Sequence, residues 1–189
     1  MIDVPPEPLP MQEQIIEQRL LDCGLYPGGF TVKYEDYLQS IEIAIAPSAG
    51  ATSDNFACIK EAAGYEIVTF QDGAMFAAYM DFASELARRE MTAMYEGRLK
   101  EAGLWEGLPG REDFRSLEEY AEALEVHAGI TPGSALRVSG DGILFDPPSA
   151  SQNYADFAVR YSNLLSVVAY ASTKDRVKFG FIGNERVAE

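Results

Sequence analysis

The sequence predicts an α+β fold, in which a mostly antiparallel sheet from two hairpins and short strands is packed by about five helices. Two observations carry this prediction. Apolar side chains recur with the helical period in some segments and alternate with polar ones in others. These segments are interleaved irregularly, whereas a doubly wound parallel fold alternates strand and helix. With 189 residues, 47% of them hydrophobic, the chain needs neither metal nor disulfide to hold a core.

The N-terminal elements begin after residues 1–10, which are rich in proline and are expected to form a flexible tail. A helix is expected over 11–23, where apolar residues share one face. Alternation over 30–35 places the apolar residues at even numbers, and alternation over 41–45 places them at odd numbers. Because one regular strand cannot change parity, the chain must turn or bulge at 35–38. We expect a hairpin there.

The next elements are a helix over 52–63 and a short apolar strand over 65–70. The strand, helix and strand of 41–70 are long enough for a crossover between parallel strands. A continuous helical stripe over 74–102 predicts one long helix of about 43 Å. We expect this helix to pack its Met, Phe and Tyr side chains across the first sheet.

The C-terminal half begins with a helix expected over the segment SLEEYAEALEVHAG, whose first serine is a suitable cap. Runs at 135–138 and 143–145 flank a turn and predict a second hairpin. A helix is expected over 151–170, although its run LLSVVAYA also suits a strand. A last strand is expected over 176–183, and no internal repeat is visible.

The expected domain organisation is one compact domain over residues 11–189. Within it, a sheet subdomain over 11–72 and a second subdomain over 103–189 are joined by the helix 74–102. This helix also offers a surface for a homo-oligomer.

The charge is strongly acidic, with 30 acids against 15 bases. Residues 1–72 hold twelve acids and three bases, and no segment forms a basic stripe. Nucleic acids and anionic membrane surfaces are therefore disfavoured as partners. No apolar run approaches the roughly 20 residues that span a bilayer. Solubility accounts for the acidity, and the alternative is a basic partner that docks on the N-terminal half.

Motifs of the common enzyme classes are missing from the sequence. The single histidine, His127, lies in the last turn of a Glu-rich helix, where the helix dipole favours its charged form. One histidine excludes a zinc site that needs two from this chain. No phosphate-binding loop or nucleophile elbow occurs. We therefore expect neither a cofactor nor a metal.

Carboxylates remain the one enzymatic route. The weak catalytic candidates are Glu35, Asp36, Asp141 and Asp146. All four fall at or beside expected turns, where acids are common for structural reasons.

The two cysteines, Cys23 and Cys58, belong to helices of the same expected sheet unit. They form either a disulfide or two inert buried thiols. A disulfide would indicate an oxidising compartment, periplasmic or extracellular, reached through a removed signal peptide. The sequence as written starts without such a peptide and otherwise suits the cytoplasm.

No specific function follows from these observations. The favoured hypothesis is a non-catalytic accessory or protein-interaction domain, and the alternative is a carboxylate-dependent hydrolase or lyase without a recognisable motif. The interaction candidates are Tyr34, Glu35, Asp36 and Tyr37, because tyrosine offers a large rigid surface with a polar tip.

Overall fold

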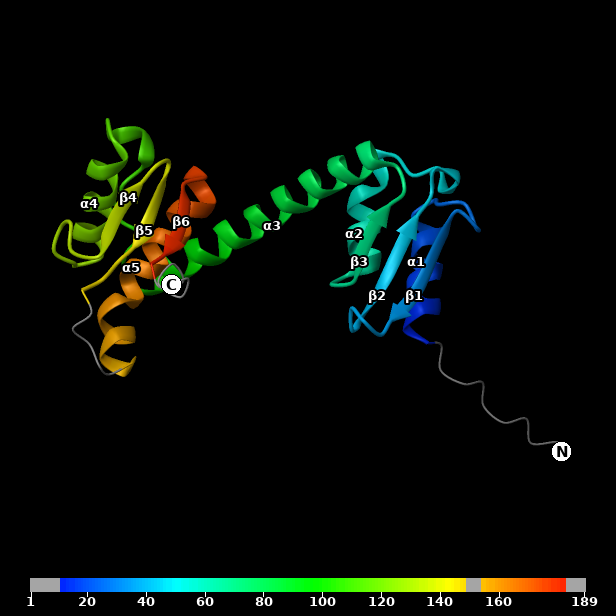
Figure 1. The fold of residues 1–189 in the computed structure, drawn as a ribbon, viewed down its shortest axis with the longest axis horizontal. Coiled ribbons are helices and arrows are strands. Elements are labelled where there is room, and N and C mark those ends of the chain that lie inside the picture. The colour runs from blue at the N-terminus through cyan, green and yellow to red at the C-terminus, as the bar shows by residue number, and fades with distance from the viewer. Residues whose placement is uncertain (1–10, 149–153, 183–189) are drawn as a thin grey trace, which may run out of the picture. The chain divides into compact units, whose positions relative to one another are not determined.

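The computed structural model describes residues 11–148 and 154–182 and confirms the α+β class. Within these residues it holds five α-helices and two three-stranded sheets (Figure 1). The chain divides into two compact units, 1–85 and 86–189, and the boundary falls inside the long helix α3 (Gly73–Glu101). The expectation that both units form a single compact domain stays a prediction.

Unit 1 holds one sheet in the order β1-β2-β3. Its elements are α1 (Gln12–Asp22), β1 (Phe30–Glu35), β2 (Ser40–Ile45), α2 (Phe56–Ala63) and β3 (Ile67–Phe70). Strands β1 and β2 pair antiparallel, which confirms the hairpin, and β2 and β3 pair parallel across α2. The two helices cover one face of the sheet, where Ile41, Ile43 and Ile45 of β2 are buried.

Helix α3 is continuous, as predicted, but only its first part packs on unit 1. Tyr79 is buried there against the rings of Phe56 and Phe70. Met80, Met91 and Met94 are instead 45%, 43% and 43% exposed. The predicted packing of the whole stripe across the sheet is therefore wrong. A strand of six residues spans only about 20 Å, which is too short to cover a helix of this length.

Unit 2 holds the second sheet, in the order β4-β5-β6. Its elements are α4 (Leu117–His127), β4 (Leu136–Ser139), β5 (Gly142–Phe145), α5 (Tyr154–Asp175) and β6 (Lys178–Phe181). Strands β4 and β5 pair antiparallel, and β5 and β6 pair parallel. The run LLSVVAYA is helical and lies in α5. The ends of two predicted elements, at 151–153 and at residue 183, lie outside the described residues.

The two units repeat one topology, although no repeat is visible in the sequence. Each runs helix, strand, strand, helix, strand, with the same sheet order and the same pairing directions. The registers also agree. In each sheet one row of paired apolar residues crosses the middle: Val32, Ile43 and Val68 in unit 1, and Val138, Ile143 and Phe179 in unit 2.

The first helices of the two units also end alike. The Cys23 amide donates to the Arg19 carbonyl at the end of α1, as the Ala128 amide donates to the Leu124 carbonyl at the end of α4. A glycine at positive φ follows each cap, Gly24 in one unit and Gly129 in the other. These matching caps align α1 with α4 residue by residue.

Candidate functional site

A groove between α1 and α2 is the candidate site of unit 1. It consists of two hollows of about 370 and about 310 Å³. The larger is lined by Arg19, Asp22, Cys23, Cys58, Glu61 and Ala62. The smaller is lined by Gln12, Ile15, Ile16, Arg19, Ala62, Ala63, Gly64, Tyr65 and Glu66. Because both hollows share Arg19 and Ala62, they lie next to each other between the two helices, and we call them together the groove.

The side chains that meet at the groove explain why it is open. Helix α1 presents Ile15 and Arg19, which lie one helical turn apart on the same face. Helix α2 presents Ala62 and Ala63, whose methyl groups do not fill the space between the helices. Ile15 is 39% exposed and Tyr65, just beyond α2, is fully exposed. The groove therefore offers apolar surface to solvent at this end.

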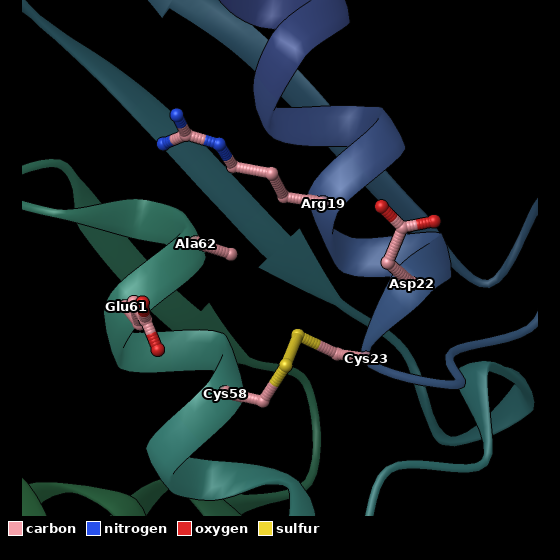
Figure 2. A pocket seen from close by; sticks show the side chains of 6 residues that line it. All are labelled: Arg19, Asp22, Cys23, Cys58, Glu61 and Ala62. Carbon is pink, nitrogen blue, oxygen red and sulfur yellow. A yellow bond between two sulfur atoms is a disulfide. The ribbon is translucent and has the colours of Figure 1, made fainter.

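A disulfide closes the other end of the groove. The Cys23 and Cys58 sulfur atoms lie 1.97 Å apart, and their Cα atoms are 5.6 Å apart. Figure 2 shows the bridge joining the end of α1 to α2 at one end of the larger hollow. Of the two alternatives left open by the sequence, the structure has the disulfide. The bridge fixes the separation of the two helices that form the groove.

Charged side chains flank the larger hollow. Asp22 and Glu61 are exposed on opposite helices, and Gln18 donates to the Asp22 carboxylate at 3.0 Å. Arg19 extends from α1 toward α2 (Figure 2). Within the part of the chain that the structure describes, no acceptor pairs with the Arg19 guanidinium. The groove thus presents charged groups that remain available to a partner.

Glu66 fixes the apolar end of the groove to the sheet. Its carboxylate accepts hydrogen bonds from the Ser40 hydroxyl, the Ile41 amide and the Gln12 side chain, each at 2.8 Å. These bonds tie the first turn of α1 and the start of β2 to the residue before β3. Both ends of the groove are therefore held in place.

The hairpin candidates lie at the β1–β2 turn. Tyr34 is 44% exposed and Tyr37 is 76% exposed. The Lys33 ammonium bonds Glu35 at 2.8 Å, and this contact raises the pKa of Lys33. Asp36 is exposed, and its backbone carbonyl accepts from Gln39 within the turn. The turn explains both acids without a ligand.

The two acids of unit 2 lie apart, at opposite ends of β5. Asp141 precedes the strand and accepts from Lys178 at 2.7 Å. That hydrogen bond and the charge of Lys178 lower the pKa of Asp141. Asp146 follows the strand, 3.6 Å from Arg137. At about 3.3 Å per residue, the two acids are separated by roughly 16 Å of strand, so they do not converge on one substrate atom.

Buried polar side chains in unit 2 hold loops in place. The Glu125 carboxylate is fully buried and accepts from the amides of Gly133, Ala135 and Leu136. His127 donates from Nε2 to the Leu104 carbonyl at 2.7 Å. The helical spacing of the glutamates in α4 predicts a solvated face, which is wrong for the buried Glu125, and neither loop contact has a signature in the sequence.

A hydroxyl–carboxylate pair joins α4 to the end of α5. The Tyr120 hydroxyl donates to Asp175 at 2.7 Å. Burial, and then this hydrogen bond, raises the pKa of Tyr120. The Asp175 carboxylate also accepts from the Arg111 amide at 3.4 Å. The pair therefore fastens the loop before α4 to both helices.

The sequence predicts that the two cysteines lie in the same sheet unit, where the structure has them, but it gives no prediction for the remaining groove residues. Their one local signal was the pair of alanines, Ala62 and Ala63, at the end of an amphipathic helix. Small residues at a helix surface allow a neighbour to approach or leave a gap, and the sequence does not distinguish these outcomes.

The described residues contain no group of three or more His, Cys, Asp or Glu side chains that could hold a metal ion. No helix in the described ranges is both long enough and apolar enough to cross a membrane. Comparison with family models, curated proteins and solved structures finds no match to this chain.

Proposed function

We propose that the protein is a non-catalytic interaction module whose acidic unit 1 binds a basic segment of a partner protein in the α1–α2 groove. The open groove is the observation that carries this proposal. It combines hollows of about 370 and about 310 Å³, exposed apolar surface at Ile15 and Tyr65, and flanking carboxylates at Asp22 and Glu61.

The charge of the N-terminal part favours a basic partner. Residues 1–72 hold twelve acids against three bases. Such an excess attracts cationic segments and speeds their encounter with the groove. Asp22 and Glu61 then provide acceptors for Lys or Arg side chains on either side of the larger hollow.

The fixed geometry of the groove also supports binding. The Cys23–Cys58 bridge holds one end, and the hydrogen bonds of Glu66 hold the other. A groove that is formed before binding loses little conformational entropy when a ligand enters. The disulfide further supports an oxidising compartment, periplasmic or extracellular, as the place where the protein works.

The alternative of a carboxylate-dependent hydrolase or lyase has no comparable support. It needs two convergent carboxylates, one of them shielded from water. Asp141 and Asp146 flank one strand at opposite ends, and Asp22 and Glu61 are both exposed. No observation on the described residues therefore favours this hypothesis over the interaction module.

Affinity capture from the native extract tests the proposal. The full chain is immobilised, and bound proteins are eluted by raising the salt from about 50 to about 500 mM, which screens charge attraction. We expect a protein retained at low salt and released at high salt. Glu61→Lys and Asp22→Lys should each weaken retention. Each replaces a carboxylate acceptor at the groove with a positive charge, which repels a basic partner.

The matched control is Asp81→Lys, which makes the same charge change at an exposed position of α3 outside the groove. Retention should survive this substitution. Equal retention by wild type and both groove variants would contradict the proposal, as would a partner that high salt does not release.

A further inference from the structure

The internal repeat shows what covers the equivalent groove in unit 2. The matching helix caps assign each groove residue of α1 a counterpart in α4. In order, Ile15, Arg19, Asp22 and Cys23 correspond to Tyr120, Leu124, His127 and Ala128. Tyr120 and Leu124 are fully buried, whereas Ile15 is 39% exposed and Arg19 is exposed. The counterpart surface is therefore covered.

Residues 104–114, the segment before α4, provide this cover on the α4 side. The Leu104 carbonyl accepts from the His127 side chain at 2.7 Å. The ring of Phe114 packs on the ring of Tyr120, with centroids 5.6 Å apart. The segment thus contacts the counterparts of Asp22 and Ile15 directly.

The same segment reaches α5, the counterpart of α2. Trp105 packs edge-on against Tyr170, with ring centroids 5.4 Å apart. The Arg111 amide donates to Asp175, the last residue of α5, at 3.4 Å. Residues 104–114 therefore contact both helices, and they do so as irregular chain with one 3₁₀ turn at Arg111–Asp113.

Building on the proposed function, we infer that the α1–α2 groove of unit 1 binds an irregular partner segment that carries aromatic anchors and basic side chains. The aromatic anchors follow from Trp105 and Phe114, which occupy the counterpart surface. The basic side chains follow from the exposed carboxylates of Asp22 and Glu61, which line the larger hollow. The partner segment is thus a basic equivalent of residues 104–114.

The probe is a labelled peptide, LWKGLPGRKKF, which keeps the aromatic residues of 104–114 and has lysine at each of its three acidic positions. Fluorescence anisotropy follows its titration with the full chain at low salt. We expect saturable binding. A control peptide with both aromatic residues replaced by alanine should bind about tenfold more weakly or worse, because buried aromatic anchors dominate such interfaces.

Two substitutions of the full chain locate the peptide. Ile15→Lys places a charge in the groove and should weaken binding by about tenfold or more. Ile67→Lys is the matched control, because Ile67 is 37% exposed, close to the 39% of Ile15, and lies outside both hollows. Its binding should equal that of the wild type.

Several outcomes would overturn the inference. Equal binding of the aromatic-free peptide would show attraction by charge alone. Equal weakening by Ile15→Lys and Ile67→Lys would place the peptide elsewhere. A dimer that Glu61→Lys dissociates would identify a second copy as the occupant. Tenfold tighter binding of the peptide by a chain lacking residues 1–10 would identify these residues as the occupant of the groove. A captured partner that Glu61→Lys loses but the peptide does not displace would leave the proposed function standing and reject only this inference.

Discussion

Leu20 and Glu125 occupy the same position in the two units, yet one is apolar and the other is an acid. Each is fully buried in the first helix of its unit. Each accepts, through its carbonyl, the amide of the residue after the capping glycine: Leu25 for Leu20 and Ile130 for Glu125. The repeat therefore conserves the backbone geometry of this position, while the side chain has a different task in each unit.

Glu125 should be essential to the stability of unit 2. Glu125→Leu, which introduces the residue of unit 1, removes the acceptor of the three amides from Gly133, Ala135 and Leu136. Because each donor left without its partner costs roughly 1–3 kcal/mol, the three amides together predict a loss of about 3 to 9 kcal/mol in the free energy of unfolding. Denaturant unfolding measures this loss. Glu125→Gln should lose less, and an unchanged midpoint in both variants would contradict the role of the carboxylate.

Tyr120 should make unit 2 sensitive to alkali. Burial and the bond to Asp175 raise the pKa of Tyr120 above its unfolded value of about 10. The contribution of neutral Tyr120 is complete below the unfolded pKa. It is lost as pH rises above about 10, because the tyrosine of the unfolded chain then releases its proton first. The free energy of unfolding falls by up to roughly 1.4 kcal/mol per pH unit. Tyr120→Phe should flatten this decline between pH 9 and about 11 in pH-resolved unfolding.

The control for this alkaline experiment is Tyr37→Phe, because Tyr37 is 76% exposed. Its unfolding profile should follow the wild type. A wild-type decline that Tyr120→Phe does not flatten would show that other groups cause it.

The Cys23–Cys58 bridge should stabilise unit 1 through the unfolded state. It joins residues separated by 35 positions, and the loop-entropy model then gives about 4 kcal/mol. We expect the double Cys→Ser variant to lose stability on this scale in denaturant unfolding, and reductant to destabilise the wild type equally. Thiol titration of the denatured, non-reduced chain checks the bond itself. Two free thiols per chain would contradict it.

Tyr65 and Tyr37 separate the groove from the hairpin turn as binding surfaces. Both side chains are exposed, Tyr65 fully and Tyr37 by 76%, so neither alanine variant should change stability. Only Tyr65 lines the groove. Tyr65→Ala should therefore weaken binding of the peptide probe severalfold, whereas Tyr37→Ala should leave it unchanged. If Tyr37→Ala weakened binding in the anisotropy titration and Tyr65→Ala did not, the binding site would be at the hairpin residues predicted from the sequence.

Most helices and strands could be predicted from the sequence, because each has its own local periodicity of apolar residues. The parity change between 30–35 and 41–45 located the first hairpin, which the structure places at the same residues. The register of that hairpin and the long helix follow from the same kind of pattern. The packing of α3 on the first sheet depends on the length of the helix relative to the length of the strands. Local periodicity does not contain this comparison, so the packing was predicted wrongly.

The repeated topology could not be found in the sequence, because the two units share backbone positions but have different residue types at those positions. The buried position of Leu20 holds Glu125 in the second unit, and α2 has 8 residues where α5 has 22. The groove escaped for a related reason. It depends on how α1 and α2 meet in space, where the small side chain of Ala62 leaves room. Neither feature has a signature within a single helix.

Mapping the peptide by NMR tests most directly whether the open α1–α2 groove is the binding site. Amide chemical shifts of the isotope-labelled full chain are followed as LWKGLPGRKKF is added. We expect the largest, saturable shifts within 12–23 and 58–66, which hold the groove residues. Shifts centred on the turn at 36–39, or on unit 2 alone, would contradict it.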